Sequence, residues 1–185
     1  MMAGDTLNVI SICGSLRKAS YNAGIARLLP ALAPAGMKIA AAPGYQGFPH
    51  FNQDLAIPGD VMALADAVRA ADGVVIVSPE YGSAIPGALK NALDWISRVK
   101  DQPFKDKPVA LQSASPGPLG GSRMQDHLRQ TLTANEAVIL IKPEVQIAFA
   151  KGKFDAETVE LKDQAAIDLI RQQLEAFGKF VRRLG

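Results

Sequence analysis

Residues 73–77 read Gly-Val-Val-Ile-Val, and this run is the clearest strand in the chain. Every position after the glycine is apolar and β-branched, which is typical of a strand covered on both faces of a sheet. The run ends at Ser78-Pro79, and a helical pattern opens at Pro86-Gly87. A buried strand that leads through a loop into a helix is the repeating unit of a parallel α/β sheet.

The same unit recurs on both sides of this run. Further short apolar runs predict strands at residues 7–12, 37–41, 109–112 and 138–141. Patterns with apolar residues three and four apart predict helices at residues 22–32, 61–71, 86–99, 123–134 and 163–183. Pro30 is expected to kink or shorten the first of these helices.

This alternation predicts an α/β fold in which helices cover both faces of a five-stranded parallel sheet. Right-handed crossovers favour the strand order 2-1-3-4-5 in such a three-layer α/β/α sandwich. With 185 residues the chain is predicted to form one domain, residues 1–185. Ligands bind at the carboxyl ends of the strands where the order reverses. We therefore expect the site in the loops after the first, third and fourth strands.

Composition argues for an ordinary globular protein and against several other classes. Hydrophobic residues make up 48% and charged residues 21%, and the net charge is only +2. No apolar run approaches the roughly 20 residues of a membrane helix, and the start, which includes Asp5, does not resemble a signal peptide. We therefore expect a cytoplasmic protein that does not bind membranes. We expect no nucleic-acid binding either, because the basic residues are dispersed.

The few cysteine and histidine residues limit the possible chemistry. Cys13 is the single cysteine, so an internal disulfide is excluded, and we expect it to be a small packed residue. His50 and His127 lie far apart in sequence, so no metal site is expected. Trp95 and Phe177 are expected in the core. The aromatic-rich segment 44–55 is expected to cover either the rim of the site or an interface.

The first of the three loops has the chemistry of a phosphate site. Residues 14–22 read Gly-Ser-Leu-Arg-Lys-Ala-Ser-Tyr-Asn and run directly into a helix, whose N-terminus presents unpaired N–H groups. Ser15, Ser20 and Asn22 add neutral donors, and Arg17 adds a charged one. The loop is neither a Walker A loop nor a dinucleotide fingerprint. The alternative is an ordinary helix capped by Ser20 or Asn22.

The second loop, residues 78–87, contains two prolines and two glycines, which hold the backbone on a set path. Such a backbone can offer amides to the edge of a flat heterocycle, against which Tyr81 can pack. The alternative is a plain turn in which Glu80 is solvated.

The third loop, residues 113–121, has three glycines, at which a backbone can approach a planar ligand without a Cβ in the way. The alternative is a flexible surface turn. All three unusual loops fall where the topology independently predicts a pocket.

Together these motifs closely resemble the signature of NADPH-dependent FMN reductases, most of all the bacterial chromate and quinone reductases of that family. The matching segments are Gly14-Ser15-Leu16-Arg17 with Ser20 and Asn22, Ser78-Pro79-Glu80-Tyr81 with residues 85–95, and Ser115-Pro116-Gly117 with Gly120-Gly121. The string from Pro79 to Trp95 is the most specific of these. The resemblance covers nearly the whole chain and implies a flavodoxin-like fold with bound FMN.

By that resemblance the FMN phosphate is expected to be held by Ser15, Arg17, Ser20, Tyr21 and Asn22. The isoalloxazine ring is expected between Pro79, Glu80, Tyr81 and Gly82 on one flank and Ser115 and Gly117 on the other. The family commonly has asparagine at the position of Gly82, so only a backbone role carries over there.

The implied activity is transfer of hydride from NADPH or NADH to the flavin, and then of electrons to a quinone, chromate, a free flavin or an azo compound. Because the flavin carries the chemistry, we expect ping-pong kinetics without a catalytic side chain. The resemblance also suggests a homodimer or homotetramer. One alternative is a flavodoxin-like electron carrier without NAD(P)H turnover. Another is a receiver-type signalling domain, which would need acidic residues where this chain has Cys13-Gly14-Ser15.

Overall fold

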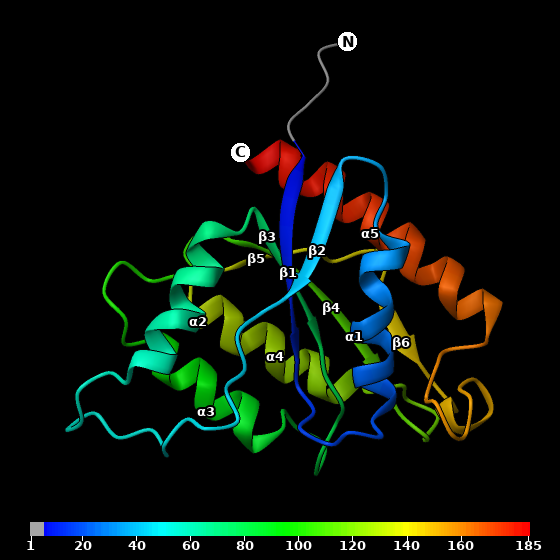
Figure 1. Cartoon of the computed structure of the whole chain (residues 1–185), viewed down its shortest axis with the longest axis horizontal. Coiled ribbons are helices and arrows are strands. Elements are labelled where there is room, and N and C mark those ends of the chain that lie inside the picture. Colours follow the sequence, from blue (N-terminus) through cyan, green and yellow to red (C-terminus); the bar gives the residue numbers. More distant parts are fainter. Residues whose placement is uncertain (1–5) are drawn as a thin grey trace.

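The computed structural model describes residues 6–185, in which one parallel sheet is flanked by helices (Figure 1). The strands are β1 (Leu7–Cys13), β2 (Met37–Ala41), β3 (Gly73–Val77), β4 (Pro108–Ala114), β5 (Val138–Ile139) and β6 (Val145–Ile147). The helices are α1 (Tyr21–Leu32), α2 (Gly59–Ala70), α3 (Gly87–Ile96), α4 (Ser122–Ala134) and α5 (Gln164–Leu184), with a short 3-10 turn η1 (Ala150–Gly152).

The strand order β2-β1-β3-β4-β5 confirms the predicted order 2-1-3-4-5. Helices α1 and α5 cover one face of the sheet, and α2, α3 and α4 cover the other (Figure 1). Strands β3 and β4 are buried at every position because they lie between both helical layers. This explains why their sequences are continuous apolar runs rather than alternating ones.

The carboxyl ends of β1, β3 and β4 lie side by side. Gly14 N donates to Val77 O at 2.8 Å, and Ser78 N donates to Gln112 O at 3.0 Å, so each loop starts against its neighbour. A Cβ on Gly14 would lie 2.2 Å from Ser78 Oγ, which explains why glycine follows β1. The first two predicted loops are therefore in direct contact.

The last strand differs from its prediction. Residues 138–141 were expected to form one strand, but β5 ends at Ile139 and the chain pairs with β4 again at β6. Pro143 lies between the two segments and has no N–H to donate, which explains the interruption. Strand β6 was not predicted from the sequence; it pairs with residues 112–114, at the end of β4 where the site was expected.

The helices lie where the sequence predicted them, within a few residues at their ends. Pro30 lies inside α1 without shortening it, because that helix continues to Leu32. Trp95 and Phe177 are buried in the core, as expected. Within residues 6–185, no helix combines the length and apolarity needed to cross a bilayer.

Two aromatic residues of segment 44–55 pack inward, and the expected role of this segment at the rim of the site or at an interface stays a prediction. Tyr45 is buried, and its hydroxyl donates to Cys13 O at 2.7 Å. Phe51 packs edge-on against Trp95, with ring centroids 5.2 Å apart. These side chains therefore fasten the segment to the body of the molecule.

Candidate functional site

A cleft at the carboxyl edge of the sheet brings the three predicted loops together. Its lining consists of Arg17, Ser20, Tyr21, Asn22, Pro79, Glu80, Tyr81, Ala114, Ser115 and Pro116. All the predicted cofactor-binding residues except Ser15, Gly82 and Gly117 line it. The loops are far apart in sequence, so the strand order alone gathers them.

The phosphate-type loop ends in a capped helix whose first amides border the cleft. Ser20 is the N-cap of α1, and its Oγ accepts from Ala23 N at 3.4 Å. The main-chain N–H groups of Tyr21 and Asn22 belong to the first turn and have no intrahelical acceptor. Arg17 is exposed at the rim and donates to Ala19 O. Capping by Ser20 is therefore compatible with an anion site, because these amides remain available.

Asn22 has a second role that the sequence did not predict. Its side chain is buried; Nδ2 donates to Ala114 O at 2.9 Å, and Oδ1 accepts from Ala114 N at 2.8 Å. This pair of bonds joins the start of α1 to the end of β4. It thereby fixes the phosphate-type loop relative to the third loop.

Ser15 contacts the second loop rather than lining the cleft. Its buried Oγ accepts from Arg17 N at 3.3 Å and lies 3.4 Å from Tyr81 Oη. Tyr81 is 51% exposed and borders the cleft. An exposed aromatic ring beside an apolar strand end is a suitable packing surface for a flat ligand.

Tyr81 and Ala84 enclose a tight turn with Gly82 at its tip. Tyr81 N donates to Ala84 O at 3.1 Å and Ala84 N to Tyr81 O at 3.0 Å, while Gly82 and Ser83 have φ of 55° and 63°. Positive φ at both central residues defines a type I′ turn. A Cβ on Gly82 would meet no atom within 4 Å, so an asparagine side chain would fit there.

Glu80 is not merely solvated, so the alternative interpretation of the second loop is wrong. Its side chain is 16% exposed, and Oε2 accepts from Met124 N at 3.2 Å in the first turn of α4. The N-cap of α4 is Gly121, which has no side chain to satisfy that turn. Glu80 therefore caps α4 from a distant loop and holds the second loop against this helix.

The glycines of the third loop serve two purposes. A Cβ on Gly120 would lie 2.7 Å from Gln146 C, and one on Gly121 would lie 2.8 Å from Ser113 Cβ. These two glycines are needed for packing within the protein, not for approach to a ligand, which corrects the sequence interpretation. A Cβ on Gly117 would meet only Ser115 Oγ, at 3.6 Å. Gly117 alone of the three therefore keeps an accessible backbone face.

Cys13 lies at the end of β1, just before the phosphate-type loop. Burial raises the pKa of its thiol above the ordinary value, although a backbone hydrogen bond with Ser15 and the charge of Arg27 act in the opposite sense. The thiol is therefore protonated at neutral pH, as expected of a packed residue rather than a reactive one.

A larger cleft lies behind the phosphate-type loop. Its volume is ≈ 370 Å³, against ≈ 180 Å³ for the cleft between the three loops. Its wall is formed by the end of β1, by Ser15 and Leu16 of the phosphate-type loop, by one side of α1 and by residues 41–46 at the end of β2. We assign the functional site to the smaller cleft because residues at the N-terminus of α1 and in the loops after β3 and β4 line it.

A doubly wound sheet with this order, and a ligand cleft at the loops after β1, β3 and β4, defines a flavodoxin-like protein. The sequence model of the NADPH-dependent FMN reductases matches residues 7–152, and the chain belongs to this family.

Named relatives agree with this assignment. The chain is 45% identical over 184 residues to a quinone reductase of Escherichia coli (strain K12), covering 97% of this chain and 98% of that protein. It is 44% identical over 183 residues to an NAD(P)H-dependent FMN reductase of Pseudomonas aeruginosa, with the same coverage. Among solved structures, the flavoenzyme NAD(P)H:(acceptor) oxidoreductase FerB of Paracoccus denitrificans superposes with a TM-score of 0.86 at 30% identity, covering 97% of this chain and 99% of that one. The protein is thus an NAD(P)H-dependent reductase of the FMN reductase class.

Proposed function

We propose that the cleft binds FMN and that the protein uses NAD(P)H to reduce a quinone. The observation that carries the proposal is the meeting of a helix N-terminus with two loops in one cleft at the switch point of the sheet. The helix N-terminus suits a monophosphate, and the two loops suit a flat ring.

In this proposal each loop has a separate task. The amides of Tyr21 and Asn22, the hydroxyl of Ser20 and the guanidinium of Arg17 hold the phosphate. Residues 79–82 form one flank of the ring, and Ser115 and Gly117 form the other. When bound, FMN accepts hydride from a nicotinamide and passes electrons to an acceptor.

The chain's own residues bind and orient, and none is required to transfer a proton. Glu80 is the carboxylate that lines the cleft, and it is committed to the amide of Met124. Tyr81 offers a phenol hydroxyl that lies near Ser15 Oγ. This agrees with ping-pong turnover in which nicotinamide and acceptor use one slot in succession.

The proposal of a quinone as acceptor rests on relatives. The Escherichia coli protein at 45% identity is named a quinone reductase, and a protein of Burkholderia at 35% identity is named a 2-hydroxy-1,4-benzoquinone reductase. The match to the Escherichia coli protein covers 97% of this chain and includes all three loops. The match to the Burkholderia protein covers 81% of this chain.

Steady-state turnover with NADPH and a soluble benzoquinone tests the activity. We expect FMN-dependent consumption of NADPH, with parallel double-reciprocal plots when both substrates are varied. An electron carrier would consume no NADPH on its own, and intersecting plots would contradict a shared slot.

A further inference from the structure

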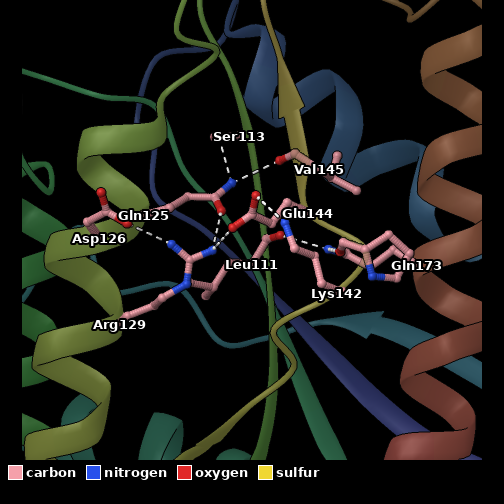
Figure 2. A network of polar contacts seen from close by, with 10 residues as sticks. Leu111, Ser113, Gln125, Asp126, Arg129, Lys142, Glu144, Val145 and Gln173 are labelled. Atoms are coloured by element: carbon pink, nitrogen blue, oxygen red, sulfur yellow. Dashed lines mark hydrogen bonds and ion pairs between the residues drawn. The ribbon is translucent and has the colours of Figure 1, made fainter.

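The first turn of α4 contacts both loops that are proposed to flank the flavin ring. Met124 N donates to Glu80 Oε2 of the second loop, and Nε2 of the next residue, Gln125, donates to Ser113 Oγ at the start of the third loop. Gln125 is fully buried and does not line the cleft. Figure 2 shows its amide at the centre of a network that joins α4, β4 and the chain before β6.

Every polar atom of the Gln125 amide has a partner. Nε2 donates to Ser113 Oγ and to Val145 O, both at 2.8 Å, and Oε1 accepts from Arg129 Nη2 at 3.3 Å. Arg129 is held in turn by Asp126 at 2.9 Å and Glu144 at 3.0 Å (Figure 2). A buried amide with all its bonds made has a single orientation, so the two groups that it binds are fixed as well.

Both groups that Gln125 binds control the third loop. Ser113 Oγ donates to Gly120 O at 2.6 Å and fixes the end of the loop. Val145 begins β6, and the chain that follows fixes the start of the loop. There Ser115 N donates to Ile147 O at 3.0 Å, and Phe149 N donates to Gly117 O at 3.1 Å. One side chain thus braces residues 115–120 from two sides.

We infer that Gln125 is a positioning residue, which holds Ser115 and Gly117 at the distance from the second loop that the flavin ring requires. The inference rests on the proposed function, because it assumes that the ring lies between these loops. It predicts that Gln125 sets the affinity for the ring without touching the ligand. The affinity for the phosphate depends on a different segment and should not change.

Replacement of Gln125 by methionine tests the inference, since Gln125→Met keeps the length of the side chain and removes its hydrogen bonds. Gln173→Met is the matched control. Gln173 is also buried; its Nε2 donates to Leu111 O and Pro143 O, and its Oε1 accepts from Gln112, on the face of the sheet covered by α5 (Figure 2). Both variants lose a comparable set of bonds, but only Gln125 is bonded to Ser113, whose hydroxyl holds the third loop directly at Gly120.

The purified apoproteins are titrated with FMN and with riboflavin, and their melting temperatures are recorded. We expect Gln125→Met to raise the Kd for FMN and for riboflavin by the same factor, about tenfold, and Gln173→Met to leave both within about twofold at a similar melting temperature. Equal weakening in both variants, or none in either, would overturn the positioning role. A wild-type protein that takes up no FMN would instead refute the proposed function itself.

Ser113→Ala provides an independent test if Gln125→Met does not fold. It removes the bond to Gly120 O and should weaken FMN binding by a similar factor. Where both variants fold, the double variant should be little weaker than either single one, because both act through one network. Fully additive losses, or an unchanged affinity in Ser113→Ala, would contradict the inference.

Discussion

The two ends of the proposed flavin cleft are built in different ways. The phosphate end is one continuous segment, residues 14–22, whose donors come from its own side chains and from the helix that it begins. The ring end consists of two loops from different strands, and each is held by residues that are distant in sequence. The donors of the first end are local in sequence, although Asn22 also ties this end to Ala114, whereas both loops of the second end depend on distant partners.

Because of this difference, substitutions at the two ends should affect ligand affinity in different ways. Changes in the phosphate loop should discriminate FMN from riboflavin, because the two ligands differ only in the phosphate. Changes in the braces of the ring loops should affect both ligands equally. A variant that crosses this division would show that the two ends are not independent.

The largest effect is expected from a negative charge in the phosphate loop. Ser20→Asp keeps the N-cap of α1, because aspartate caps as well as serine does. It places a carboxylate beside the phosphate, so FMN affinity should fall about a hundredfold, while riboflavin affinity changes little. Ser20→Asn has the same shape without the charge and is the control. If Ser20→Asp weakened the binding of FMN and of riboflavin equally, the phosphate would not bind at this loop.

The next effect compares two glycines that both have positive φ. Gly120→Asn should cost about 2 kcal/mol of unfolding free energy, because its Cβ would collide with the backbone of Gln146. Gly82→Asn should be neutral or stabilising by about 0.5 kcal/mol, since its φ suits asparagine and the space is open. Chemical denaturation measures both. A large loss in Gly82→Asn would show that the turn at the ring needs glycine itself.

A smaller effect is expected from the non-local cap of α4. Glu80→Ala removes the acceptor for Met124 N and should lower the unfolding free energy by about 1 kcal/mol. FMN and riboflavin should both bind more weakly, because the second loop loses its attachment. Glu80→Gln keeps an acceptor oxygen and should retain most of the stability. If Glu80→Ala weakened FMN alone, Glu80 would belong to the phosphate end.

The smallest effect concerns Cys13, at the end of β1 just before the phosphate-type loop. Because burial raises the pKa of this thiol, alkylation by iodoacetamide at pH 7.5 should be at least about tenfold slower than for free cysteine. Because the pKa of Cys13 is higher in the folded state, its contribution to the free energy of unfolding is fully present below the ordinary thiol pKa. This contribution is lost as the pH rises from the ordinary pKa through the raised one. Cys13→Ala should keep full NADPH turnover. Rapid labelling that abolishes turnover would contradict this assignment.

The sequence was informative where the chemistry is contiguous. The strand order followed from apolar runs such as 73–77, and the phosphate-type loop could be recognised because its donors are consecutive. The braces could not be predicted in the same way. Glu80 bonds to Met124, which is 44 residues away, and Gln125 bonds to Val145, which is 20 residues away. Nothing in the sequence near either residue indicates these partners. Strand β6 was missed because a proline separates it from β5. The support that β6 gives to the third loop was therefore missed as well.

The most direct test is an equilibrium titration of the wild-type apoprotein with FMN and with riboflavin. The account predicts uptake of one FMN per chain, with riboflavin bound at least about tenfold more weakly because the amides of Tyr21 and Asn22 then lack their anion. Equal affinities for the two ligands, or no uptake of FMN at all, would contradict it.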